Sequence, residues 1–344
     1  MMRITYIVTS ELKSRRHMKS TSTSVLSTRW RHLPWLLPEL SIDVQDFLSA
    51  PCADPIDEND MEQAMASLTK ETMSFLNKQQ REFTISSLHL NLYLINTFLH
   101  KVGPLIGDAI NSGLLKDLDL GILDKTWTND RSDEEMQQRA QHIDGFFTAY
   151  PCVLHCLTKL FLKNVGFEKL DMHHVLFNSC KQLKHLTLYH CDTGSYSIFK
   201  IDAPDSKLCV PEIDKCRFLR VDLVCLPKLD KFFCDYWVSR YAPLTFGFVP
   251  SLGELELSSG SVCEEHIFKL SELLHGVTSI HTLTLDFQGE TPYIIDGALS
   301  ENSPYGGFEH SGIPDGIPQL EEYLAVYCSM SLSIVFAYFF MLAG

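Results

Sequence analysis

The segment that most constrains this chain is Leu183–Cys191, whose residues follow the pattern L-x-x-L-x-L-x-x-C. Within it, Leu186 and Leu188 alternate with Thr187 and Tyr189, and this period of two is typical of a β-strand with one buried face. Related segments begin at Ile85, Leu115, Leu157, Leu208, Leu252 and Ile280, with a weaker copy at Leu226. The pattern therefore predicts a row of short strands rather than a single isolated one.

The spacing of these segments indicates the architecture. From Leu157 onward the successive starts are 26, 25, 44 and 28 residues apart, and the weaker copy divides the longest step into 18 and 26. A repeat of about 20–29 residues with this core is characteristic of leucine-rich repeats, in which each turn holds one short strand and a return segment. We therefore expect an α/β leucine-rich-repeat solenoid over residues 84–290.

The charge of the chain is unevenly distributed. The net charge is −14, yet residues 1–33 carry seven Lys and Arg residues against one acid. The rest of the chain is thus strongly acidic, which argues against nucleic-acid binding by the main domain.

Eleven cysteines occur, and none of them forms a C-x-x-C pair. Several, including Cys191 and Cys216, fall at repeat positions where a small buried side chain is expected. We interpret them as reduced thiols of a cytoplasmic or nuclear protein. No secretory signal peptide is visible, although the Arg- and Ser-containing residues 1–20 would also suit a transit peptide.

Residues 23–33 read T-S-V-L-S-T-R-W-R-H-L, in which Val25, Leu26, Trp30 and Leu33 can share one face of a short helix. This run resembles the second half of the F-box of plant proteins, and residues 1–50 are interpreted as a partial F-box region. The resemblance implies that these four residues bind a Skp-type adaptor of a cullin ubiquitin ligase. The alternative is a basic helix that caps the first turn of the solenoid.

Residues 51–83 are interpreted as an acidic linker followed by an amphipathic helix. Asn59 and Glu62 have capping-box spacing, and Met61, Met65 and Leu68 follow at helical intervals, which predicts a helix over 60–79. We expect its methionine-lined face to pack on the repeats, with partner binding as the alternative.

Resemblance to plant F-box/leucine-rich-repeat proteins extends from Thr23 to about Gly289, and includes the phrases Val221–Leu229 and Phe248–Leu257. It implies a solenoid with a short helical N-terminal F-box remnant. The implied function is a non-catalytic, substrate-recruiting subunit of a Skp-cullin-type ubiquitin ligase. The alternative is a leucine-rich-repeat scaffold that binds protein without adaptor docking.

In each L-x-x-L-x-L unit, the residues beside the last two leucines should line the concave, target-binding sheet. Acidic residues predominate there, so we expect a basic segment of the target to bind this face. The residues are Asp117, Asp119, Lys159, Lys163, His185, Thr187, Tyr189, Glu212, Asp214, Glu254, Glu256 and Asp286.

No catalytic, cofactor-binding or metal site is expected. Cys180, His185, His190 and Cys191 are zinc-ligand types, but the strand phase turns His185 and Cys191 to opposite faces. His173 and His174 lack a nucleophile or a paired carboxylate. The aromatic-rich stretch 232–248 favours a core, with a small-ligand pocket as the alternative.

Residues 291–322 are rich in Gly and Pro and are interpreted as a linker. The hydrophobic C-terminal segment 323–344 follows, and Leu324–Gly344 carries no charge. As a helix it would be roughly 30 Å long, enough for a membrane tail anchor with the solenoid in the cytosol. The alternative is translation of an intron or of a shifted reading frame.

Overall fold

The computed structural model of this chain describes most of residues 37–286 and little outside them. The described residues are 37–48, 55–77, 83–126, 131–167, 174–194, 197–236, 242–258, 267–268, 273–277, 279–286, 293–294 and 332–335. They belong to two units, Met1–Tyr189 and His190–Gly344. The predicted adaptor-binding residues Val25, Leu26, Trp30 and Leu33 lie outside the described residues.

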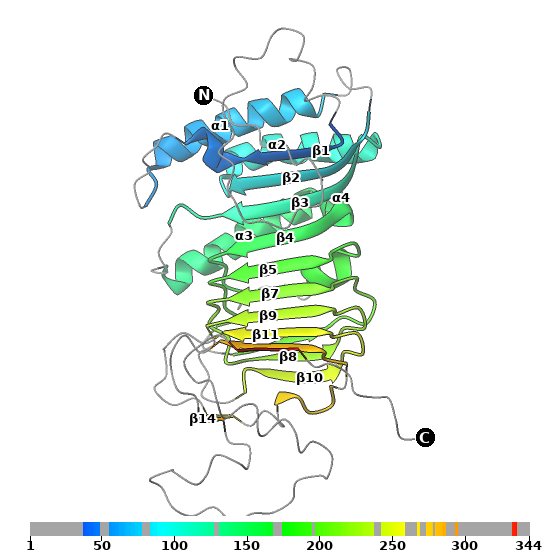
Figure 1. Ribbon diagram of the computed structural model, residues 1–344. Coiled ribbons are helices and arrows are strands. Elements are labelled where there is room, and N and C mark those ends of the chain that lie inside the picture. The colour runs from blue at the N-terminus through cyan, green and yellow to red at the C-terminus, as the bar shows by residue number, and fades with distance from the viewer. Residues whose placement is uncertain are drawn as a thin grey trace, which may run out of the picture. The chain divides into compact units, whose positions relative to one another are not determined.

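The first unit is built on a parallel sheet with the strand order β1-β2-β3-β4-β5 (Figure 1). The strands are β1 (Glu39–Asp43), β2 (Ile85–Tyr93), β3 (Leu115–Leu123), β4 (Leu157–Lys163) and β5 (His185–Tyr189). Strands β2 to β5 confirm the strands expected from the repeated pattern. Their leucines are buried because every second side chain points to the same side of a strand.

Strand β1 was not expected, because residues 1–50 were interpreted as a helical F-box remnant. Leu40 and Ile42 are buried and alternate with the more exposed Glu39, Ser41 and Asp43. This period of two suits the edge of a sheet better than a helix. A short 3₁₀ turn over Val44–Phe47 follows.

Helices form the return segments of the first unit. They are α1 (Glu58–Phe75), α2 (Asn96–Asn111), α3 (Asp133–Ala149) and α4 (Pro151–Cys156), and a π-helical turn spans His174–Ser179. Helices α1, α2 and α4 pack against strands β2 and β3. Helix α3 buries Ile143 and Phe147.

Helix α1 confirms the amphipathic helix, with Met61, Met65 and Leu68 buried. The expected capping box at Asn59 and Glu62 is wrong. The helix begins two residues earlier, where the Asp57 side chain accepts a 2.8 Å hydrogen bond from the Asn59 backbone N–H. An aspartate satisfies this otherwise unpaired donor, so the helix starts at Glu58.

From β6 to β11, the chain of the second unit alternates between two sheets of parallel strands. Strands β7 (Val210–Asp214), β9 (Lys231–Asp235), β11 (Glu254–Ser258) and β13 (Thr282–Asp286) form one sheet. Strands β6 (Ile198–Asp202), β8 (Arg220–Cys225) and β10 (Leu244–Phe248) form the other. Here the described return segments are strands, whereas in the first unit they are helices.

The weaker repeat copy was placed in the wrong phase. Strand β9 turns Phe232 and Cys234 inward, so its repeat begins at Leu229 rather than at Leu226. An aromatic ring and a thiol occupy the positions of the last two leucines, which hides the pattern. The rings of Phe199 and Phe218 fill the core nearby, stacked with centroids 4.7 Å apart.

The aromatic-rich stretch does not act as one core. Phe232 is fully buried, but Phe233 is only partly buried and Phe248 is 59% exposed. Alternation along β9 separates Phe232 from Phe233, because neighbouring side chains of a strand point to opposite faces.

Few residues of the C-terminal segments are described. Strand β12 (Ile267–Phe268) pairs with β14 (Tyr293–Ile294), and β15 (Leu332–Val335) runs antiparallel to β13. The expected helix over Leu324–Gly344 is thus a strand where it is described. Among the described helices, none has the length and apolar character needed to cross a membrane.

Candidate functional site: the solvent face of the parallel strands

The predicted target-binding residues of the first unit fall on one face of its sheet. Backbone register aligns Asp119 of β3 with Lys159 of β4, and Lys159 with His185 of β5. Further along the same two strands, Phe161 is in register with Thr187, and Lys163 with Tyr189. Asp117 is exposed at the start of β3. These residues therefore share one face of the sheet, as the leucine pattern predicted; their role in target binding stays a prediction.

Several of these side chains bind their neighbours rather than solvent. Asp119 is only 8% exposed, accepts a 2.9 Å hydrogen bond from Thr158 Oγ1 and lies 3.1 Å from Lys159 Nζ. Lys163 is equally buried, donates to the Thr126 carbonyl at 2.8 Å and stands 5.3 Å from the centroid of the Tyr189 ring. The charges of Asp119 and Lys163 therefore stabilise the sheet and offer little to a partner.

In the second unit, the predicted acidic residues also share one face. Glu212 of β7 is in register with Phe233 of β9, and Phe233 with Glu256 of β11. Glu254, one pleat earlier, lies 2.7 Å from Lys231 Nζ in an ion pair. Glu256 is exposed, so it is better placed than Glu254 to present charge to a partner.

Two residues of this face escaped sequence reasoning. Phe233 and Asp235 belong to β9, which was assigned the wrong phase. Asp235 is in register with Asp214 at the ends of β9 and β7. One carboxylate oxygen of each is buried without a hydrogen-bond partner within the described structure. Starting the repeat at Leu229 would have placed both residues on the solvent face.

Burial and, next in size, the charge of Asp235 raise the pKa of Asp214 to about 6, although Lys215 acts in the opposite direction. Two carboxylates held side by side cannot both ionise without cost, so one of them retains a proton at higher pH than an isolated aspartate would.

A turn of one conformation ends successive strands. Asn164, His190, Lys215 and Tyr236 have φ between 50° and 56°, in the left-handed region. Each donates its backbone N–H, at 2.8–3.0 Å, to the carbonyl of the last residue of the next strand; the acceptors are Tyr189, Asp214, Asp235 and Ser258 respectively. A positive φ is uncommon outside glycine, so its recurrence indicates a structural repeat.

The end of strand β4 is stabilised by a buried ionic cluster. The side chain of Asp124 is 2% exposed and lies 2.9 Å from Arg131 and 3.3 Å from Arg139. Arg139 also donates to the carbonyls of Leu123, Lys163 and Asn164. These bonds join α3 to the ends of β3 and β4, so the cluster is structural and its groups are already occupied.

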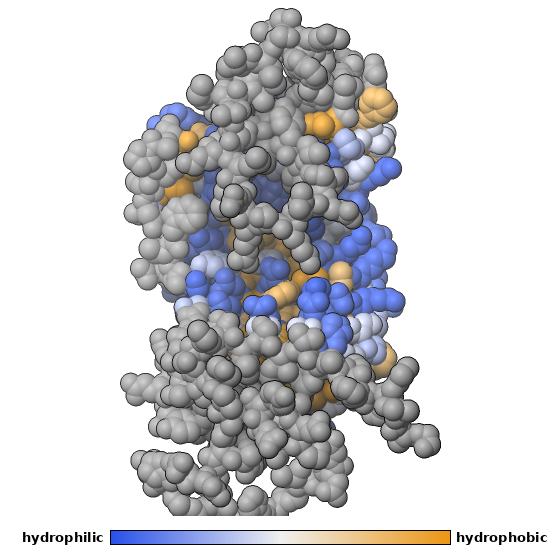
Figure 2. All heavy atoms as spheres, viewed as in Figure 1, coloured by the Kyte–Doolittle hydropathy of each residue, from blue (hydrophilic) through white to orange (hydrophobic). Residues whose placement is uncertain are grey.

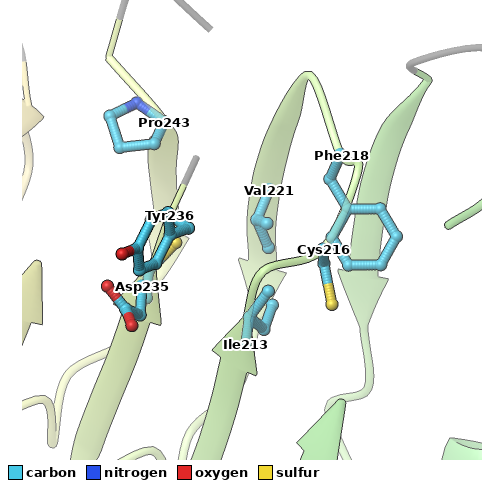
Figure 3. A pocket seen from close by; sticks show the side chains of 8 residues that line it. Ile213, Cys216, Phe218, Val221, Asp235, Tyr236 and Pro243 are labelled. Atoms are coloured by element: carbon cyan, nitrogen blue, oxygen red, sulfur yellow. The ribbon is translucent and has the colours of Figure 1, made fainter. Parts of the chain in front are cut away.

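A cavity of about 10 Å³ lies among the strands of the second unit, and Figure 3 shows Asp235 and Tyr236 beside it. Its other lining residues are Ile213, Cys216, Phe218, Val221, Cys234 and Pro243. This volume holds at most one water molecule. The cavity therefore does not supply the small-ligand pocket considered for the aromatic-rich stretch.

Among the described residues, no group of three or more His, Cys, Asp or Glu side chains is placed to hold a metal ion. Figure 2 shows hydrophilic side chains, in blue, mixed with hydrophobic ones, in orange, over the coloured part of the viewed face.

Comparison of this chain with protein-family models, curated proteins and solved structures finds no match.

Proposed function

We propose that this chain is a leucine-rich-repeat protein that binds a target protein on the solvent face of its parallel strands. The observation that supports this most strongly is the recurring left-handed turn, with its N–H bound to the end of the next strand. Repeats stacked in this way present a broad surface of alternate side chains, which suits protein binding better than a small substrate.

The chemistry of the target follows from the acidic residues on this face. Glu212, Asp214, Asp235 and Glu256 come from neighbouring strands of the second unit, and only Lys231, which is paired with Glu254, adds positive charge to the described part of these strands. A basic segment of the target would complement this charge. Binding should then weaken as added salt screens the interaction.

The proposed role is non-catalytic recruitment to a cullin-type ubiquitin ligase. The support is the resemblance of residues 23–33 to half of a plant F-box, with Val25, Leu26, Trp30 and Leu33 as the adaptor contacts. The buried thiols of Cys156, Cys180, Cys216 and Cys234 are not in disulfides, which is consistent with a reducing compartment, cytoplasmic or nuclear.

A binding assay between the full chain and a Skp-type adaptor tests this role. Buried aromatic anchors dominate interface energy, so Trp30→Ala should cost about 2 kcal/mol, roughly 30-fold in Kd. Trp35→Ala is the matched control, because it removes a tryptophan outside the motif. Equal adaptor binding by wild type and Trp30→Ala would refute the docking site. If wild type does not bind at all, the scaffold alternative is favoured.

A further inference from the structure

We propose that Asp214 and Asp235 form a carboxyl pair that shares one proton and so makes the charge of the acidic face in the second unit depend on pH. In mildly acidic solution the pair would carry one negative charge, and at neutral pH it would approach two. The consequence for target binding rests on the proposed function. The shared proton itself does not.

The backbone holds the two carboxyl groups together. Asp214 and Asp235 are the last residues of β7 and β9 and are in register across a parallel pair of strands. Their carbonyls accept 3.0 Å hydrogen bonds from the N–H groups of His190 and Lys215. Strands of one sheet stand about 4.8 Å apart, so the side chains cannot separate far without breaking the sheet.

The surroundings favour the protonated form. The Oδ1 atoms of Asp214 and Asp235 are both buried, and no described donor reaches them. A buried carboxylate oxygen without a donor loses its hydration and gains nothing in return, whereas a proton between two carboxyl groups supplies a hydrogen bond.

The other charged or titratable groups around the pair do not remove this effect. Glu212, on the same strand, adds negative charge. The positive charge of Lys215 favours the ionised form of Asp214. Its Nζ, however, is placed over the Tyr236 ring, 5.1 Å from the centroid. Burial raises the pKa of the Cys234 thiol to about 12, so it stays neutral. On β11, the residue in register with Asp235 is the uncharged Ser258. The next residue in register, beyond Ser258, is Asp286 of β13.

The direction of the pH effect follows from the raised pKa of Asp214, about 6 in the folded chain against 3.8 ordinarily. Between these two pH values, Asp214 keeps its proton in the folded chain, whereas in the unfolded chain it has already released that proton. This contribution to stability is therefore fully present below about pH 4 and is lost as the pH rises through about 6.

Carbon-13 NMR titration of the full chain, labelled at its aspartate carboxyl carbons, tests the pair directly. We expect one aspartate resonance with a midpoint near pH 6, assigned by its absence in Asp214→Asn. In Asp235→Asn the midpoint of Asp214 should fall by about one pH unit. Asp205→Asn, an exposed loop position of the same unit, is the matched control and should leave it unchanged.

A wild-type titration in which every aspartate carboxyl has a midpoint below about pH 5 would overturn the proposal. That measurement needs no variant, so it remains decisive even if Asp214→Asn fails to fold. An unchanged Asp214 midpoint in Asp235→Asn would equally exclude a shared proton, because the neighbouring charge would then have no influence.

Fluorescence anisotropy with a labelled hexa-arginine peptide tests the effect on the face. Wild type should bind the peptide several-fold more tightly at pH 7 than at pH 5, and the Asp214→Asn/Asp235→Asn chain should lose this difference. A midpoint near pH 6 with pH-independent peptide binding would refute the regulation of binding. Absence of peptide binding at both pH values would count against the proposed basic target and leave the NMR result intact.

Discussion

The side-chain Nδ2 of Asn164 donates a 2.6 Å hydrogen bond to Oδ2 of Asp124, although the two residues are 40 positions apart in the chain. Asn164 is the left-handed residue that ends β4, and its own N–H binds the Tyr189 carbonyl. One residue thus connects the ionic cluster around Asp124 to the repeated turn. This relationship makes Asp124 a position whose loss should be felt in both the cluster and the turn.

Replacing Asp124 by alanine should destabilise the protein by about 3–5 kcal/mol. Arg131 and Arg139 are each less than 15% exposed at the side chain and would lose their buried counter-charge. Urea unfolding followed by circular dichroism measures the loss. Glu134→Gln, an exposed acid in the first turn of α3, is the control and should cost less than about 1 kcal/mol. Similar losses for the two variants would contradict the role of the cluster.

Acid should weaken the same cluster. Burial alone would raise the pKa of Asp124, but the charge of Arg139 and hydrogen bonds from Arg131 and Asn164 outweigh it and lower the pKa below 3.8. A lowered folded-state pKa contributes stability above the unfolded value, and this is lost as the pH falls through the folded value. We expect the unfolding midpoint in urea to drop below about pH 4 in wild type. In Asp124→Asn this part of the drop should be missing.

Two glycine-to-alanine changes should act in opposite directions. A Cβ added at Gly247 of β10 would clash with the Val224 backbone carbonyl oxygen, so Gly247→Ala must displace neighbouring backbone. Overpacking of this kind costs about 1–3 kcal/mol. At Gly145, exposed within α3, a Cβ would meet nothing within 4 Å, and alanine should stabilise the helix by about 1 kcal/mol. Thermal unfolding of both variants checks the signs, and a stabilising Gly247→Ala would show that the close contact is absent.

Charge reversal on the acidic face should affect binding more at Glu256 than at Glu254. Glu256 is exposed, whereas Glu254 already pairs with Lys231 at 2.7 Å. Glu256→Lys should weaken hexa-arginine binding about tenfold or less at low salt, with the difference shrinking as salt rises. The matched reversal Glu254→Lys should have the smaller effect, because Lys231 already compensates much of the charge of Glu254. Binding that does not respond to Glu256→Lys would place the basic-target site elsewhere.

The recurring period of two in the sequence was sufficient to predict α/β organisation, the strands β2 to β5 and the inward-facing leucines. Helix α1 was likewise predicted from the spacing of Met61, Met65 and Leu68. Strand β9 was misaligned because Phe232 and Cys234 stand where leucines were expected. Strand β1 was missed because a resemblance to a helical domain was extended over residues 39–43, where Leu40 and Ile42 already alternate.

Which side chain faces inward was determined by the sequence itself, since neighbouring residues of a strand must point to opposite faces. Which residues meet across strands was decided only by the tertiary structure. The loop lengths and left-handed turns set the register that brings Asp214 beside Asp235 and Asn164 beside Asp124. Local pattern carries no information about that register. The acidic face was therefore predictable as a composition, but the shared carboxyl pair and the buried ionic cluster depend on how distant segments pack together.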